Sequence, residues 1–214
     1  MKKFAIIVAG GSGTRMKSEV PKQFLDLHGE PIIIKTVRQF LSADQSIGLV
    51  VVLPKKHLSF WKALEKDYPF ISSIKIAIGG PSRTASVKSG LRHIPDEGIV
   101  AVHDAVRPFV SPEVINNSYE SAVRNGSGVA AVALKDSIRE RVDEGKSIAR
   151  DRDDFVIVQT PQTFQVKLLK ESYEEVGGDF SDDATVFERS HHRVFLVEGS
   201  YSNIKITTPE DLRQ

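Results

Sequence analysis

Short apolar runs recur through the first two thirds of the chain and alternate with segments whose apolar residues follow helical spacing. The runs lie at Phe4–Val8, Ile47–Leu53, Ile74–Ile78, Ile99–Val102 and Val129–Leu134. An uninterrupted apolar run is typical of a strand that is buried on both faces. The alternation therefore predicts an α/β protein with a mostly parallel central sheet and helices on both faces.

The intervening segments carry helix start signals. Pro31 opens the run PIIIKTVRQFL, and Ser111, Pro112 and Glu113 read as an N-cap, a first helical residue and an early acid. A further helix is indicated by the spacing of Phe60, Trp61, Leu64 and Tyr68, and we expect Trp61 to be core or partly exposed packing rather than a platform for base stacking.

The alternation of strand-like and helix-like segments stops after Leu134. Residues 135–152 form two polar alternating segments around the turn-rich Asp143–Lys146, which predicts a protruding β-hairpin. Such a hairpin is either a solvated surface feature or an arm that reaches a partner subunit. After it we expect strands at Phe155–Gln159, Val194–Val197 and Asn203–Thr207, a helix near Val166–Val176, and a helix beginning at Thr208–Asp211, close to the last residue, Gln214.

Composition narrows the class of protein. The 214 residues fit one α/β domain, 1–214. A net charge of +1 argues against nucleic acid as a partner, and the lack of cysteine excludes disulfides and thiolate metal sites. The N-terminal apolar run is too short for a signal segment, and no stretch could span a bilayer. We therefore expect a cytoplasmic protein with no membrane partner.

The first predicted strand runs into a glycine-rich turn, AGGSGTRMKSEVPK. Gly10, Gly11 and Gly13 lack Cβ, so several backbone N–H groups can approach an anion, and Arg15 and Lys22 follow. This order predicts a phosphate cradle, although a plain strand-to-helix turn remains the alternative.

Two common nucleotide-binding patterns do not match this turn. Met16 stands where the dinucleotide pattern needs its third glycine, which argues against a nicotinamide-dependent oxidoreductase. Thr14 stands where the P-loop needs its lysine.

Three further polar segments are predicted to reach the same edge of the sheet. Gly79–Ser86 suits close approach to a ribose or base, or else simple helix capping. Asp104 ends a strand and either serves a ligand or orders its loop with Arg107, while the neighbouring His103 is expected to be structural. Lys205 interrupts an apolar strand and should meet a phosphate or carboxylate.

Seven segments, in order along nearly the whole chain, carry a resemblance to a known family: AGGSGTRM, VPKQF, GGPSRTASVKSGL, VHDAVRPF, QTPQTF, SDDATVFE and VEGSYSNIKITTPEDL. They resemble the 2-C-methyl-D-erythritol 4-phosphate cytidylyltransferases of the non-mevalonate isoprenoid pathway. The ribitol-5-phosphate cytidylyltransferases, which share the glycine turn, HDAVRP and NIKIT, are the competing family. RTASVKSGL and the position of Arg152, eight residues before TPQ, favour the former.

The resemblance implies a Rossmann-like nucleotidyltransferase fold and a homodimer joined through the 135–152 arm. It implies that CTP is bound by Ala9, Gly10, Gly11, Gly13 and Ser86. Arg15 and Lys22 would be the catalytic cations. The polyol phosphate would be held by Asp104, Arg107, Thr160 and Lys205, with Ser137, Arg139 and Arg152 from the partner's arm. Two positions depart from the family pattern: Pro81 stands where an acidic residue is frequent, and Ser137 stands where threonine is usual.

The implied reaction is attack of a phosphate oxygen on the α-phosphorus of CTP. A phosphate monoester is largely dianionic at pH 7, so the reaction needs no general base. It needs positioning and positive charge, which we expect from Arg15, Lys22 and Mg²⁺ bridging the triphosphate. A non-catalytic nucleotide-binding regulator is the remaining alternative, and measured pyrophosphate release would exclude it.

Overall fold

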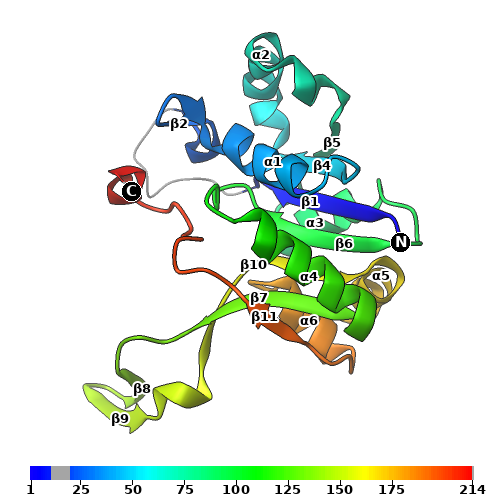
Figure 1. The fold of residues 1–214 in the computed structure, drawn as a ribbon. Helices are drawn as coiled ribbons and strands as arrows, with labels where there is room; N and C mark the ends of the chain where they lie inside the picture. Colours follow the sequence, from blue (N-terminus) through cyan, green and yellow to red (C-terminus); the bar gives the residue numbers. More distant parts are fainter. Residues whose placement is uncertain (11–19, 214) are drawn as a thin grey trace.

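The computed structural model describes residues 1–10 and 20–213 and places seven strands of that part of the chain in one sheet (Figure 1). Their order is β11-β7-β10-β6-β1-β4-β5. The bounds are β1 Lys3–Val8, β4 Gly48–Leu53, β5 Lys75–Ile78, β6 Ile99–Asp104, β7 Ser127–Ala133, β10 Val156–Gln165 and β11 Leu196–Glu198. The five strands predicted in the first two thirds of the chain are present, each within two residues of its expected ends.

The sheet is mostly parallel, as predicted. β1 pairs in parallel with β4 and β6, β4 with β5, and β7 with β11, while β10 runs antiparallel between β6 and β7. β10 is twice as long as the predicted strand Phe155–Gln159, because it continues past Pro161 after a register shift between Val158 and Gln162. The proline made the sequence look as if the strand ended there.

Helices cover both faces of the sheet, and β1 shows why. Ala5, Ile7 and Ala9 belong to one apolar cluster, with α1 (Ile32–Ala43), α2 (Leu58–Asp67) and α4 (Pro112–Asn125). Ile6 and Val8 belong to the other, with α3 (Arg83–Leu91), α5 (Val166–Glu175) and α6 (Asp183–Arg189). Successive residues of a strand point to opposite faces, so an uninterrupted apolar strand supplies both cores. Trp61 is buried in the first cluster, as predicted.

The predicted hairpin is also present. β8 (Ile138–Asp143) and β9 (Lys146–Arg150) pair in antiparallel fashion and extend away from the sheet (Figure 1). Gly145 adopts a φ of +72° at the turn, a conformation that favours glycine. An ion pair between Glu140 and Arg150 links the two strands. The hairpin contributes nothing to either core cluster of the sheet.

The segment after β11 differs from the prediction. Residues 203–207 form no strand. They are held by separate bonds: the Ile206 N–H donates to Val106 O, and Arg107 Nη1 donates to Asn203 O at 2.8 Å. The segment beginning at Thr208 is a 3-10 helix, Pro209–Arg213, in which the Asp211 N–H donates to Thr208 O. The Asp211 carboxylate accepts from the N–H groups of Thr207 and Thr208. The short sheet β2 (Asp26–Leu27) and β3 (Glu30–Pro31) packs nearby through Leu27.

Candidate active site

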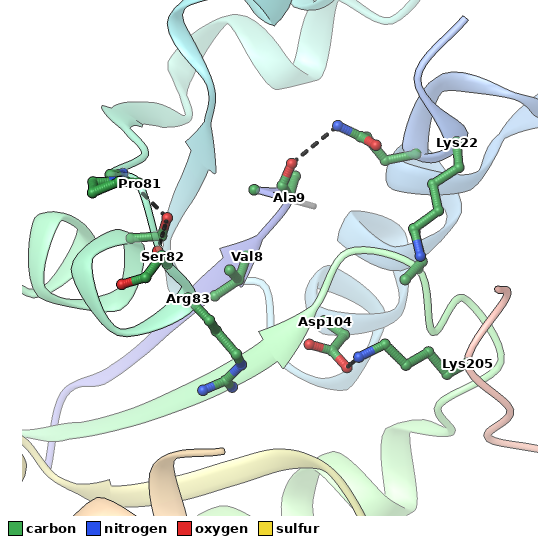
Figure 2. A pocket seen from close by; sticks show the side chains of 13 residues that line it. Val8, Ala9, Lys22, Pro81, Ser82, Arg83, Asp104 and Lys205 are labelled. Carbon is green, nitrogen blue, oxygen red and sulfur yellow. Dashed lines mark hydrogen bonds and ion pairs between the residues drawn. The ribbon is translucent and has the colours of Figure 1, made fainter. Parts of the chain in front are cut away.

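A cavity of about 250 Å³ opens at the carboxyl ends of β1 and β6, where loops from distant parts of the sequence meet (Figure 2). This edge is the usual ligand site of a parallel sheet. The lining residues come from five segments of the described chain: Val8, Ala9, Gly10, Lys22, Gln23, Gly80, Pro81, Ser82, Arg83, Ser86, Asp104, Val106 and Lys205.

One wall of the pocket is the loop that leads into α3. Ser82 caps the helix, because its Oγ accepts from the Ala85 N–H at 3.1 Å. The Ser86 hydroxyl donates to Ser82 O at 2.8 Å and accepts from the Gly80 N–H at 3.2 Å, so it fixes the loop. A Cβ at Gly80 would lie 2.4 Å from Ala85 Cβ, so the loop admits only glycine there. Gly10 faces the same serine, with a hypothetical Cβ 3.1 Å from Ser86 Oγ.

The opposite wall is built around Asp104, at the end of β6. Lys205 Nζ lies 2.9 Å from Asp104 Oδ2, and Arg107 Nε lies 3.5 Å from the same oxygen. Burial by itself would raise the pKa of Asp104, but the cations Lys205, Arg83 and Arg107 lower it to about 2. The pocket therefore holds an ionised carboxylate with positive charge on several sides, and Lys205 does meet a carboxylate, as predicted.

His103 and Thr160 support this aspartate from behind. The Asp104 N–H donates to Thr160 Oγ1 at 3.1 Å, and that hydroxyl lies 3.0 Å from His103 Nδ1. His103 Nε2 lies 3.1 Å from Arg107 O, which can only accept, so Nε2 carries the proton and Nδ1 is the acceptor. Burial lowers the pKa of His103 to about 4. His103 is thus a neutral structural residue, as expected from the sequence.

A second buried network orients Arg83. Its Nη2 lies 2.5 Å from Asp183 Oδ2, and Tyr173 Oη donates to Asp183 Oδ1 at 2.5 Å. Gln162 Oε1 accepts from the N–H groups of Asp183 and Ala184 and thereby holds the start of α6. Arg83 lines the pocket while Asp183 is fully buried, so α6 anchors the α3 wall.

Sequence reasoning did not single out Arg83, Asp183, Gln162 or the pocket residue Gln23. Their partners lie on elements far away in sequence, and the only available signal was that RTASVKSGL, SDDATVFE, QTPQTF and VPKQF contain them.

The structure brings together the predicted residues Ala9, Gly10, Lys22, Ser86, Asp104 and Lys205. Arg107 and Thr160 touch Asp104 but do not line the cavity. Ser137, Arg139 and Arg152 lie in the 135–152 arm, away from this pocket, where Arg152 Nη1 donates to Lys135 O and Arg139 bonds to Ser147. Gly11, Gly13 and Arg15 lie outside the described residues.

The pocket suits a metal ion carried by a ligand's phosphates. No cluster of three or more potential metal ligands occurs among the described residues, and Asp104 is the one carboxylate among the residues that line the cavity. Mg²⁺ commonly keeps its waters and binds through one or two carboxylates plus substrate phosphates.

None of the described helices is long and apolar enough to cross a membrane.

Comparison with known proteins agrees with this geometry. Residues 4–214 match the family model described as 2-C-methyl-D-erythritol 4-phosphate cytidylyltransferase. The chain is 43% identical over 214 residues to a protein of that name from Phocaeicola vulgatus, covering 100% of this chain and 97% of the relative. It is 39% identical over 218 residues to the Bacillus velezensis protein of the same name, covering 99% and 93%.

The fold matches solved structures of similarly named proteins. The 4-diphosphocytidyl-2C-methyl-D-erythritol synthase of Anaerococcus prevotii matches with a TM-score of 0.83 at 29% identity, covering 100% of this chain and 96% of that one. The 2-C-methyl-D-erythritol 4-phosphate cytidylyltransferase of Thermus thermophilus matches with a TM-score of 0.78 at 29% identity, with the same coverage.

Proposed function

The chain belongs to the 2-C-methyl-D-erythritol 4-phosphate cytidylyltransferase family, and we propose that the pocket at the carboxyl edge of its sheet is where it performs the family's reaction. That reaction transfers the cytidylyl group of CTP to 2-C-methyl-D-erythritol 4-phosphate and releases pyrophosphate, in the non-mevalonate isoprenoid pathway. The observation that carries the assignment of the site is the convergence of Lys22, Ser86, Asp104 and Lys205 on one cavity.

The chemistry is an in-line exchange at phosphorus. An oxygen of the acceptor's phosphate forms a bond to the α-phosphorus, and the bond from that phosphorus to the bridging oxygen of pyrophosphate breaks. The attacking monoester is largely dianionic at neutral pH, so no proton has to be removed. His103 does not line the cavity, and both of its ring nitrogens are bonded to Arg107 O and Thr160 Oγ1, so it is not placed to act as a base on a bound ligand. What the site must provide is alignment and charge stabilisation.

The two walls of the pocket bind different substrates. The α3 wall, with Ser86 and the backbone of Gly10, receives the cytosine nucleotide, and Lys22 stabilises charge on the phosphates together with Arg15. Asp104 and Lys205 form the acceptor side, where the carboxylate can accept from a polyol hydroxyl while the ammonium faces a phosphate. Arg107 and Thr160 hold Asp104 in place.

We assign Mg²⁺ to the bound triphosphate, and among the described residues that line the cavity Asp104 would be the carboxylate available to hold it. When bound, it would supply positive charge that stabilises the negative charge of the phosphates. Removing divalent cations with a chelator should abolish pyrophosphate release, and adding Mg²⁺ back should restore it. Unchanged release in the chelator would contradict this assignment.

We also propose that the protein is a homodimer joined through the 135–152 arm. The arm and the adjacent start of β10 expose apolar side chains that a monomer would leave in water: Val142, Ile148, Phe155, Val156, Ile157 and Val158. In such a dimer Ser137, Arg139 and Arg152 of one arm would reach the pocket of the other subunit.

Subunit complementation tests this arrangement. Arg152→Ala and Lys205→Ala should each lose most of the activity when assayed at a methylerythritol phosphate concentration below the wild-type KM. Co-expressed with different tags and purified as the mixed dimer, they should recover activity, because one pocket then has its own Lys205 and an intact Arg152 from the partner. A mixed dimer as inactive as its parents would contradict the assignment of Arg152 to the other subunit, and a monomer in sedimentation would contradict the dimer.

The reaction itself is tested by measuring pyrophosphate release from CTP and Mg²⁺ with 2-C-methyl-D-erythritol 4-phosphate or with ribitol 5-phosphate. We expect a higher kcat/KM with methylerythritol phosphate. A preference for ribitol 5-phosphate would assign the chain to the runner-up reaction, and no release with either would remove the catalytic assignment. Action in the cytoplasm stays a prediction.

A further inference from the structure

One polar side chain in the pocket is almost completely buried and lies next in sequence to a proposed catalytic cation. Gln23 is 1% exposed, and it follows Lys22 in the 3-10 helix η2 (Lys22–Phe24). Burying a carboxamide is unfavourable unless its hydrogen bonds are satisfied, so its partners indicate what the residue is for.

The Gln23 amide nitrogen uses both of its hydrogens on neighbouring elements. It donates to Ala9 O at 3.0 Å, directly after β1 (the dashed line at Ala9 in Figure 2), and to His57 Nδ1 at 3.2 Å. The Ala9 carbonyl can only accept, which fixes the orientation of the amide and makes His57 Nδ1 an acceptor. One side chain therefore ties the start of the glycine turn, η2 and the 3-10 helix η3 (Lys55–His57) to one another.

His57 is well suited to accept this bond. It is 5% exposed, and burial lowers its pKa, with Lys56 acting in the same direction, which favours the neutral imidazole with a lone pair on Nδ1. Phe24 stacks on Phe60 with ring centroids 5.3 Å apart, and the His57 ring packs edge-on against Phe24. Apolar packing thus holds the base of η2, and Gln23 sets its position relative to β1.

We propose that Gln23, with His57 as its partner, is a positioning residue that fixes Lys22 at the phosphate side of the pocket. This inference rests on the proposed function, because it assigns Gln23 a role through Lys22. Lys22 lies on the same turn of η2 and lines the cavity, and its Nζ donates to Ile206 O at 3.3 Å, next in sequence to the lining residue Lys205. An error of about 1 Å in the position of a catalytic group can cost roughly 10²-fold in rate, so a residue that sets this position controls turnover.

The test is a double-mutant cycle between Gln23→Met and Lys22→Ala, with kcat for pyrophosphate release at saturating CTP and methylerythritol phosphate as the readout. Methionine fills a similar volume and makes neither hydrogen bond. We expect Gln23→Met to lower kcat at least about 10-fold in the wild-type background, with little change in KM for methylerythritol phosphate. In the Lys22→Ala background it should lower kcat by less than about twofold, because there is no ammonium left to misplace.

Phe24→Leu is the matched control. It weakens the packing of the same short helix but leaves both Gln23 bonds in place, so it should lower Tm and leave kcat within about twofold of wild type. If Gln23→Met does not fold, His57→Ala replaces it in the same cycle. That variant keeps the bond to Ala9 and should show the same coupling with a smaller loss.

The outcomes separate the inference from the function on which it rests. Equal losses from Gln23→Met with and without Lys22, or a kcat that only follows Tm as in Phe24→Leu, would show that Gln23 is purely structural. Normal turnover of Lys22→Ala would instead remove the catalytic role of Lys22, and the inference with it. A low kcat of Lys22→Ala, together with strong coupling between the Lys22 and Gln23 substitutions, supports both the catalytic role of Lys22 and the positioning role of Gln23.

Discussion

Replacing His103 should flatten the acid dependence of stability. The imidazole is fully buried between Arg107 O and Thr160 Oγ1, and its ring lies 5.0 Å from that of Phe40. Burial lowers its pKa from 6.5 to about 4. Between these values the unfolded chain binds a proton that the folded protein does not. The stabilisation is therefore complete above pH 6.5 and is progressively lost as the pH falls towards 4.

The size of the effect follows from the two pKa values. Using 6.5 for the unfolded and about 4 for the folded state, the free energy of unfolding should fall by about 2 kcal/mol between pH 7 and pH 5 through this one residue. The ionisation of Asp104, with a pKa of about 2, affects stability only at lower pH, so the two effects do not overlap.

Equilibrium urea unfolding at several pH values from 5 to 7 measures this, with wild type and His103→Gln compared at each pH. The variant will be less stable overall, so the informative quantity is the difference in slope with pH. His93→Gln, which replaces an exposed histidine, is the control and should keep the wild-type slope. Parallel curves for wild type and His103→Gln would refute the interpretation of His103 as a neutral buried residue.

Three further results are expected. Lys22→Ala or Arg15→Met should lower kcat by at least about 10²-fold, as for loss of one transition-state donor. A near-normal rate constant for the chemical step, measured in single-turnover kinetics, would contradict their role. Lys205→Ala should raise KM for methylerythritol phosphate more than KM for CTP, because Lys205 pairs with Asp104 on the acceptor side, and the reverse pattern would reassign the two walls. Asp183→Leu should destabilise by about 3–5 kcal/mol, since it leaves the Arg83 guanidinium buried without its partner, and adding Arg83→Met should restore most of that loss in urea unfolding; equal stability of the single and double variants would argue against a tight pair.

Much of the sheet could be read from the sequence because its strands are apolar on both faces. β1, β4 and β6 need only local information, since each run of apolar residues is long enough to identify a buried strand. β10 was only half predicted, because Pro161 reads as the end of a strand while the register shift that accommodates it depends on β6 and β7. The strand predicted at residues 203–207 was wrong for a related reason: its apolar alternation is real, but Arg107 and Val106 take up its backbone groups singly.

The candidate site, like the fold, could be predicted only in part from the sequence. From the sequence alone it could be predicted that acids, cations and glycines follow the strands, and that Lys22, Ser86, Asp104 and Lys205 lie at one edge, because parallel strands end together. Which of these side chains contact one another, and which residues support them, depends on the packing of the folded chain. Gln23 and Ala9 are 14 positions apart, Asp104 and Lys205 meet across the cavity, and Arg83 is oriented by Asp183 from another helix. Such contacts depend on how the loops pack above the sheet, and a local pattern of residues does not encode that geometry.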